Sequence, residues 1–180
     1  PCAIVSLLTV LMVLLLGSKL FGFRAGFVGA CLLLLCCGFS VIGRYVTMDA
    51  SMTCFSTAMF FGSLLGVRNY RQTQTVSRFW MLFAGVACGL GFMTKGPVIA
   101  VLVLPPILLL GWLERNAFYR TWRFWLLPGI IAFVISAPWF IVTGVVNPNF
   151  VTYFFWKHNV VRFSNAFNHQ EPWWYYAPIL

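Results

Sequence analysis

The chain has 180 residues, of which 61% are hydrophobic, 18% are aromatic and only 8% are charged. A soluble domain carries roughly a quarter charged residues, so this composition excludes an ordinary water-soluble protein and indicates a membrane protein. The net charge of +9 would suggest nucleic-acid binding in a soluble protein. Here the basic residues lie mostly in short loops between apolar runs, which is typical of topology signals.

Long apolar runs succeed one another and are continuous rather than alternating, which favours helices. A helix rises about 1.5 Å per residue and a bilayer core is ~30 Å thick, so about 20 residues cross it. We expect an all-α polytopic membrane protein, part of one domain. Because the chain lacks an initiator methionine and opens almost directly into a span, we expect a fragment of a longer protein. The six expected spans are about 3–18, 26–43, 50–67, 79–93, 97–113 and 124–143, and a seventh starts near Trp173.

The range 79–113 holds a single charged residue, Lys95, among its 35 residues. That length suits two short, tilted spans. The run Thr94-Lys95-Gly96-Pro97 contains a glycine, which loosens a helix, and a proline, which suits the first turn of the next one. Because burying a lone ammonium is costly, we expect a helical hairpin with Lys95 at its tip, at a membrane surface.

The loops between the predicted spans alternate between two sides of the membrane. One side receives eight of the twelve Lys and Arg residues and one acid, Glu114. By the positive-inside rule this side is the cytoplasm, so these residues give no support to a nucleic-acid partner. The eight are Lys19, Arg24, Arg68, Arg71, Arg78, Arg115, Arg120 and Arg123.

The opposite side collects a mixed set of charged residues and histidines from three segments. A solvated loop can hold such residues for solubility alone, but their convergence on one membrane surface favours a functional site that faces outside. The set is Arg44, Asp49, Lys95, Lys157, His158, Arg162, His169 and Glu171.

The third of these segments, about 144–172, is predicted to be external and amphipathic. Phe150, Phe154, His158 and Arg162 are spaced by four, so a helix would align them along one side. Aromatic neighbours suit the headgroup region of a bilayer. Two interpretations are open: an interfacial helix whose basic residues touch lipid phosphates, or a helix that presents His158 and Arg162 to a lipid-linked substrate.

Asp49 also has competing explanations. It precedes a predicted span that starts near Ala50, where an aspartate caps free N–H groups and complements the helix dipole. Arg44, five residues earlier, could pair with Asp49 or face a substrate phosphate. The residues alone leave both alternatives open.

Three stretches carry a resemblance to a known family: GLGFMTKGP, RYVTMDASM and, above all, YFFWKHNVVRF followed by NHQEPWWYYAPI. They resemble integral-membrane glycosyltransferases of the dolichyl-phosphate-mannose–protein mannosyltransferase type, which include the bacterial transferase that moves aminoarabinose from undecaprenyl phosphate to lipid A. The resemblance implies the GT-C architecture, a transmembrane helix bundle with its active site at the outer membrane surface. It also implies a polyprenyl-phosphate-linked sugar donor, a lipid, glycan or protein acceptor, and a main catalytic carboxylate outside this chain.

The resemblance also assigns roles to single residues. It implies that Lys95 and Arg162 contact the lipid phosphate, and that Asp49 is the acidic position of the second external loop, in a supporting catalytic role. His158 matches a histidine that helps to bind a divalent metal in some members. Many relatives have an acid just before that histidine; here Lys157 stands there, and a neighbouring cation disfavours metal binding. Arg44 is a further candidate for the phosphate, and no nucleotide cofactor is implied.

Together these observations predict a multi-pass glycosyltransferase of the bacterial inner membrane whose active site faces the periplasm. In this prediction Lys95 and Arg162 stabilise the negative charge that develops on the leaving phosphate. The alternative is a transporter or flippase for an anionic or polyprenyl-linked lipid, which would use the same cations for binding alone. Transporters more often carry charges near the bilayer midplane, whereas the spans here are free of charge, which favours the enzyme.

Overall fold

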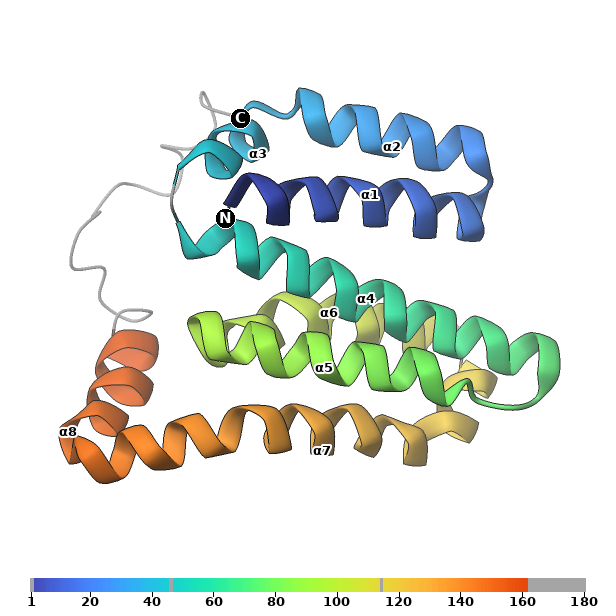
Figure 1. The fold of residues 1–180 in the computed structure, drawn as a ribbon. Coiled ribbons are helices and arrows are strands. Elements are labelled where there is room, and N and C mark those ends of the chain that lie inside the picture. Colours follow the sequence, from blue (N-terminus) through green and yellow to red (C-terminus); the bar gives the residue numbers. More distant parts are fainter. Residues whose placement is uncertain (1, 46, 114, 162–180) are drawn as a thin grey trace. The chain divides into compact units, whose positions relative to one another are not determined.

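The computed structural model describes residues 2–45, 47–113 and 115–161, and the regular elements within these ranges are all helices (Figure 1). The expectation of an all-α chain is therefore confirmed. The chain divides into two compact units, Pro1–Pro138 and Trp139–Leu180. In chain order the elements are α1 (Cys2–Phe21), α2 (Phe23–Leu35), α3 (Cys37–Arg44), α4 (Met48–Thr73), α5 (Arg78–Lys95), α6 (Val98–Leu113), α7 (Arg115–Val146), α8 (Pro148–Val151) and a π-helix (Thr152–Val161).

Among the described residues, three helical segments are long and apolar enough to cross a membrane: α1, residues Met48–Tyr70 of α4, and residues Trp125–Val146 of α7. Large apolar side chains on the outside of these helices are exposed, such as Leu15 at 64% and Phe133 at 70%. Apolar surface of this extent marks contact with lipid or another protein. These helices are those of a polytopic membrane protein, and the expected number of six spans stays a prediction.

One expected span differs from the structure. The run 26–43 is expected to be one span, and within it Cys36 adopts an extended conformation (φ −66°, ψ 112°) that separates α2 from α3. The hydroxyl of Ser40 donates a hydrogen bond of 2.9 Å to the carbonyl of Leu34, which satisfies a carbonyl near the end of α2. The segment expected as a span over 26–43 therefore contains two helices, and a side chain stabilises the break between them, which no proline marks.

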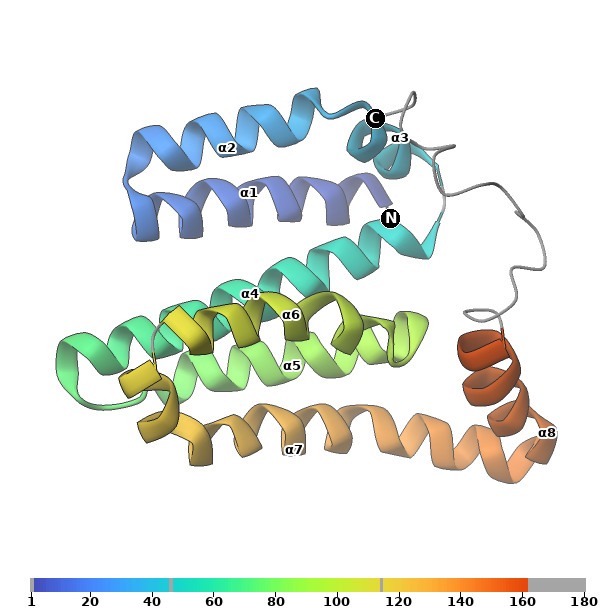
Figure 2. The ribbon, with the colours of Figure 1, turned by 180° about the vertical axis from the view of Figure 1, so that it is seen from behind.

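In the first unit, α4 packs against α1, α5 and α6. Figure 2, the view from behind, shows α6 lying across α4 and α5. Met52 of α4 and three residues of α6 form a buried cluster, and the other members are Ile99, Val103 and Ile107. Because α4 and α5 are antiparallel neighbours, the start of α4 and the end of α5 lie at the same end of this unit.

Small residues allow α5 to approach the part of α7 that belongs to the first unit. A Cβ atom at Gly85 would lie 2.9 Å from the Cα of Pro128, and one at Gly89 would lie 3.1 Å from the Cα of Ala132. Both distances are shorter than ordinary van der Waals contact. The spacing Gly-x-x-x-Gly is the pattern that lets membrane helices pack backbone to backbone.

The described part of the second unit runs from Trp139 to Val161 and is held by aromatic contacts. The rings of Trp139 and Phe150 meet edge to face with centroids 5.5 Å apart, and those of Phe150 and Phe154 stack at 5.6 Å. The contact between Phe150 and Phe154 agrees with the expected alignment of residues four apart. From Thr152 onward the helix is a π-helix, whose i→i+5 bonding widens the turn, so residues four apart no longer lie directly above one another.

Candidate functional site at the start of α4 and the end of α5

Asp49 lies in the first turn of α4. The helix starts after Thr47, which has an extended conformation (φ −119°, ψ 155°) and makes no side-chain capping bond. The hydroxyl of Thr53 donates 2.8 Å to the backbone carbonyl of Asp49, within the same helix. A carboxylate in this turn is favoured by the positive end of the helix dipole, which is one of the two explanations that the residues alone left open. The expected side-chain cap itself is not formed.

Lys95 is the last residue of α5 and stands next to a tight turn. The backbone of Gly96 has a φ of +67°, a conformation that glycine adopts at little cost, and its N–H donates 2.7 Å to the carbonyl of Phe92. Pro97 follows, and α6 begins at Val98. This geometry confirms the predicted helical hairpin with Lys95 at its tip.

The ammonium of Lys95 donates a hydrogen bond to Oδ1 of Asp49 and forms an ion pair with it. The Lys95 side chain is 37% exposed and the Asp49 side chain 47%. Solvent therefore screens the pair, and pairs of this kind contribute at most about 1 kcal/mol to stability. An ammonium has three N–H donors, and Asp49 is the only described residue that receives one of them. The pair thus presents a fixed but still available cation at the surface.

Two further contacts connect the helices around this pair. The hydroxyl of Thr94 lies 2.7 Å from the carbonyl of Gly91 and 3.5 Å from the sulfur of Met52 on α4. The thiol of Cys2, at the start of α1, lies 3.5 Å from the carbonyl of Thr47. The beginnings of α1 and α4 and the end of α5 therefore meet at one end of the first unit.

Of the other predicted site residues, Arg44 has a described side chain, and His158 and Arg162 do not. Arg44 is in the last turn of α3 and is exposed, and it makes no side-chain hydrogen bond or ion pair with any described residue. The alternative in which Arg44 pairs with Asp49 is therefore not observed; Oδ1 of Asp49 accepts from Lys95 instead. His158 lies in the π-helix, and its side chain is not described. Arg162 lies outside the described residues, as do His169 and Glu171.

The metal role suggested for His158 gains no support from the described residues. Within residues 2–45, 47–113 and 115–161, no three His, Cys, Asp or Glu side chains gather as metal ligands would. Asp49, the one acid in these ranges, is engaged by a lysine.

The opposite end of the first unit holds basic residues from α1 and α4. Lys19, in the last turn of α1, lies over the ring of Trp80 at 5.0 Å, and Arg68 donates 2.5 Å to the carbonyl of Leu20. About 19 residues of α4 separate Asp49 from Arg68, which corresponds to roughly 28 Å along the helix. The sequence-based division of these residues between two membrane sides agrees with this separation.

Residues 1–154 match the family model described as dolichyl-phosphate-mannose-protein mannosyltransferase. The chain belongs to this family. As a member whose described part includes three membrane-length helices, it is an integral membrane protein.

Three curated relatives of this mannosyltransferase-family chain carry the name undecaprenyl phosphate-alpha-4-amino-4-deoxy-L-arabinose arabinosyl transferase. The Erwinia tasmaniensis protein is 33% identical over 141 residues, and the Edwardsiella ictaluri protein is 34% identical over 145 residues. The Yersinia pestis protein is 35% identical over 146 residues. Each match covers 77% of this chain and 25% of the relative, so the chain spans a quarter of their length. No solved structure matches.

Sequence reasoning missed the pairing of Lys95 with Asp49, although it placed both on one side of the membrane. The positions of the two residues at helix ends could have indicated the pairing. An acid in the first turn of one helix and a lysine at the end of an adjacent antiparallel helix are brought together by the packing of α4 on α5. The grouping of Lys19, Arg68 and Trp80 was also missed, because its basic residues were interpreted only as topology signals.

Proposed function

We propose that this chain is part of a membrane glycosyltransferase that moves a sugar from a polyprenyl-phosphate donor to an acceptor. The observation that carries the proposal is the position of Lys95, a single cation held by Asp49 at the tip of the α5–α6 hairpin. Membership of the mannosyltransferase family supports a sugar donor of this kind. We further propose that the protein resides in a bacterial inner membrane and that this tip faces the periplasm.

Lys95 suits the phosphate of a lipid-linked donor for geometric reasons. The start of α4, at Met48, is the start of a membrane-length span, so the neighbouring Lys95 lies near the depth of lipid headgroups. One N–H of its ammonium is directed at Asp49, which leaves two for phosphate oxygens. Asp49 thereby acts as a positioning residue that limits the rotamers of a long, flexible side chain.

In the proposed reaction, negative charge develops on the donor phosphate as the sugar leaves it. The bond between the anomeric carbon and the phosphate oxygen breaks, and its electron pair remains on the phosphate. A hydroxyl or amine of the acceptor forms the new bond to the anomeric carbon and loses its proton to a general base. The general base is a carboxylate from another part of the full-length protein. Lys95 stabilises the growing negative charge on the leaving phosphate, a contribution that is usually among the larger ones in catalysis.

Arg162 is proposed as the second cation at the same phosphate. An arginine offers a planar fork of donors and a lysine offers a point charge, so the two together hold one phosphate from two sides. Arg44, exposed in the last turn of α3, is a third candidate at this membrane surface. His158 is assigned no catalytic step.

The name of these relatives guides the choice of substrate for a first test. It names an undecaprenyl phosphate carrier and an aminoarabinose sugar. We propose an undecaprenyl-phosphate-linked sugar as the donor class, with lipid A, another glycan or a protein as the acceptor.

A transfer assay with the full-length protein that contains this chain tests the proposal. The purified protein is incubated with radiolabelled aminoarabinosyl undecaprenyl phosphate, with and without lipid A, and the lipids are separated by thin-layer chromatography. The proposal predicts labelled product and free undecaprenyl phosphate only when the acceptor is present. Intact donor under all conditions, together with movement of donor between vesicle leaflets, would instead identify a flippase.

A further inference from the structure

A small pocket lies at the end of the first unit opposite the Asp49–Lys95 pair. It has a volume of about 130 Å³, and its lining comes from three helices, α1, α4 and α5. This is roughly four times the ~30 Å³ that one water molecule occupies in the liquid, so a phosphate group has room in it. The lining residues are Lys19, Leu65, Arg68, Asn69, Gln72 and Trp80.

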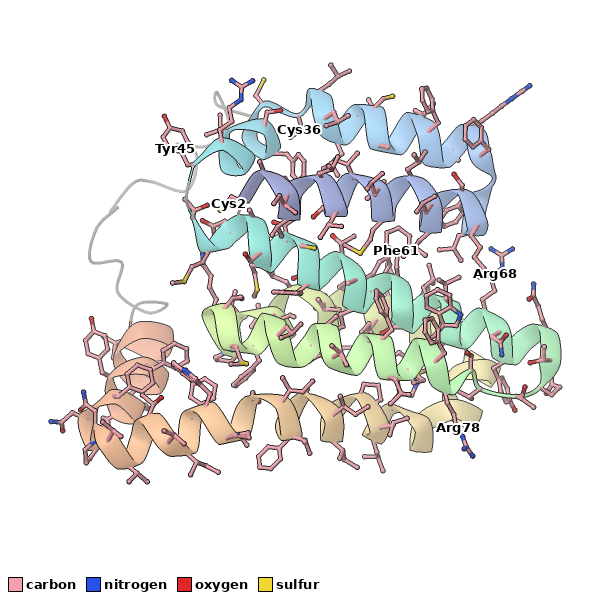
Figure 3. The ribbon with its side chains drawn as sticks, viewed as in Figure 1. Cys2, Cys36, Tyr45, Phe61, Arg68 and Arg78 are labelled. Atoms are coloured by element: carbon pink, nitrogen blue, oxygen red, sulfur yellow. The ribbon has the colours of Figure 1, made fainter. Side chains whose placement is uncertain are left out.

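Two cationic side chains from different helices line this pocket, and each has N–H groups that make no hydrogen bond to a described residue. Arg68 uses Nη1 to contact the carbonyls of Leu20 at 2.5 Å and Lys19 at 3.4 Å, and a guanidinium carries further N–H groups. Lys19 has its ammonium 5.0 Å from the centre of the Trp80 ring and donates no hydrogen bond to a described residue. Figure 3 shows Arg68 extending from α4 toward the end of α1.

The described residues supply no carboxylate to neutralise these cations. Asp49 is the one acid among them, and it lies roughly 28 Å away along α4. The pocket also includes Trp80 from the first turn of α5, whose N-terminus carries no side-chain cap. The positive end of that helix dipole favours an anion nearby.

The pocket lies at the depth where lipid headgroups meet the protein. The membrane-length segment of α4 ends at Tyr70, and the lining residues Arg68, Asn69 and Gln72 surround that end. Tryptophan is enriched at the membrane interface, and basic pockets between transmembrane helices bind the phosphates of anionic lipids. Lys19, Arg68 and Gln72 are exposed, so the pocket opens to the outside.

We propose that this pocket is a binding site for a phosphate group, presented by an anionic phospholipid of the adjacent leaflet or by free phosphate. The site is separate from the proposed donor site at Lys95 and requires no chemistry there. Lys19 and Arg68 hold the phosphate from two helices, and the bound anion ties the end of α1 to α4 and α5.

Native mass spectrometry of the full-length protein in a neutral detergent tests this site. Dihexanoyl phosphatidylglycerol is titrated, and the bound copies are counted. Lys19→Gln should weaken the tightest binding about fivefold, the effect expected for one basic residue near a lipid phosphate. Arg78→Gln is the matched control, because Arg78 is exposed at the same end but does not line the pocket and points away from Arg68 in Figure 3. This control should leave the affinity within about twofold, because solvent and salt screen the exposed charge.

Two variants are needed to test Arg68, because replacing its guanidinium also removes the hydrogen bonds to the carbonyls of Lys19 and Leu20 at the end of α1. Arg68→Gln should weaken binding at least as much as Lys19→Gln, and Arg68→Lys should restore part of the affinity through its charge. Displacement of the lipid by equimolar inorganic phosphate would assign the site to free phosphate, and resistance to it would assign the site to lipid. Equal losses for Lys19→Gln and Arg78→Gln, or unchanged affinity for both Lys19→Gln and Arg68→Gln, would overturn the proposal.

Discussion

Lys95 and Asp49 join the ends of two antiparallel helices: the ammonium at the last residue of α5 pairs with a carboxylate in the first turn of α4. Each charge also has the sign that its own helix terminus favours, since acids suit N-termini and bases suit C-termini. The pair is separated by 46 positions in the chain, so the packing of α4 against α5 brings the two residues together.

The positioning role of Asp49 predicts that the two residues act as a unit. Asp49→Asn should lower the transfer rate of the full-length enzyme when Lys95 is present, because the ammonium is then held less firmly. The same change should have little further effect in a Lys95→Ala background. A double-mutant cycle on the rate should give a coupling energy of about 1 kcal/mol or more, in the range found for residues in contact. Additive losses would show that Asp49 acts independently of Lys95.

The close contact between α5 and α7 predicts a stability effect of adding one methyl group. Gly85→Ala places a Cβ 2.9 Å from the Cα of Pro128 and 2.9 Å from the Cβ of Ile131. Overpacking of this kind costs about 1–3 kcal/mol, which exceeds the helix-propensity gain of about 1 kcal/mol for replacing glycine. The thermal unfolding midpoint in detergent should therefore fall.

Gly129→Ala is the control for this packing test. A Cβ built at Gly129 has no described atom within 4 Å apart from the neighbouring backbone of its own helix, so the gain in helix propensity is the main effect expected there. The unfolding midpoint of this variant should stay the same or rise. A fall of equal size in both variants would contradict the packing that we describe for Gly85.

The division of basic residues between the two sides predicts a membrane orientation. In a cysteine-free background, Lys95→Cys should react with a membrane-impermeant thiol reagent in intact cells. Arg71→Cys and Arg120→Cys should react only after the membrane is permeabilised, because the side richer in Lys and Arg faces the cytoplasm. Labelling of position 71 but not of position 95 in intact cells would reverse the assignment.

Local sequence signals predicted much of the fold but not its interruptions. The hairpin tip at Lys95 could be predicted because Gly96 and Pro97 mark it, and the structure has the positive φ that favours glycine there. The break at Cys36 could not, because the apolar run is continuous and no proline or glycine stands at that residue. A hydrogen bond from Ser40 to Leu34 stabilises the break, and composition does not reveal such a contact.

The candidate site was only partly predictable for a related reason. Lys95 and Asp49 could be selected as single residues, since each is a charge at the end of an apolar run. Their pairing, and the pocket between Lys19 and Arg68, depend on which helices become neighbours. The periodicity of apolar residues predicts which face of a helix is apolar, but it does not predict which other helix packs against that face.

A rate measurement tests most directly whether Lys95 stabilises the charge that develops on the donor phosphate. Single-turnover transfer from radiolabelled aminoarabinosyl undecaprenyl phosphate to lipid A is compared for the full-length enzyme and its Lys95→Ala variant, at matched amounts of folded protein in detergent. Loss of one such cation should lower the rate of the chemical step on the order of 10²–10³-fold, and Lys95→Arg should restore it only in part. A Lys95→Ala variant with a near-normal single-turnover rate would contradict the account.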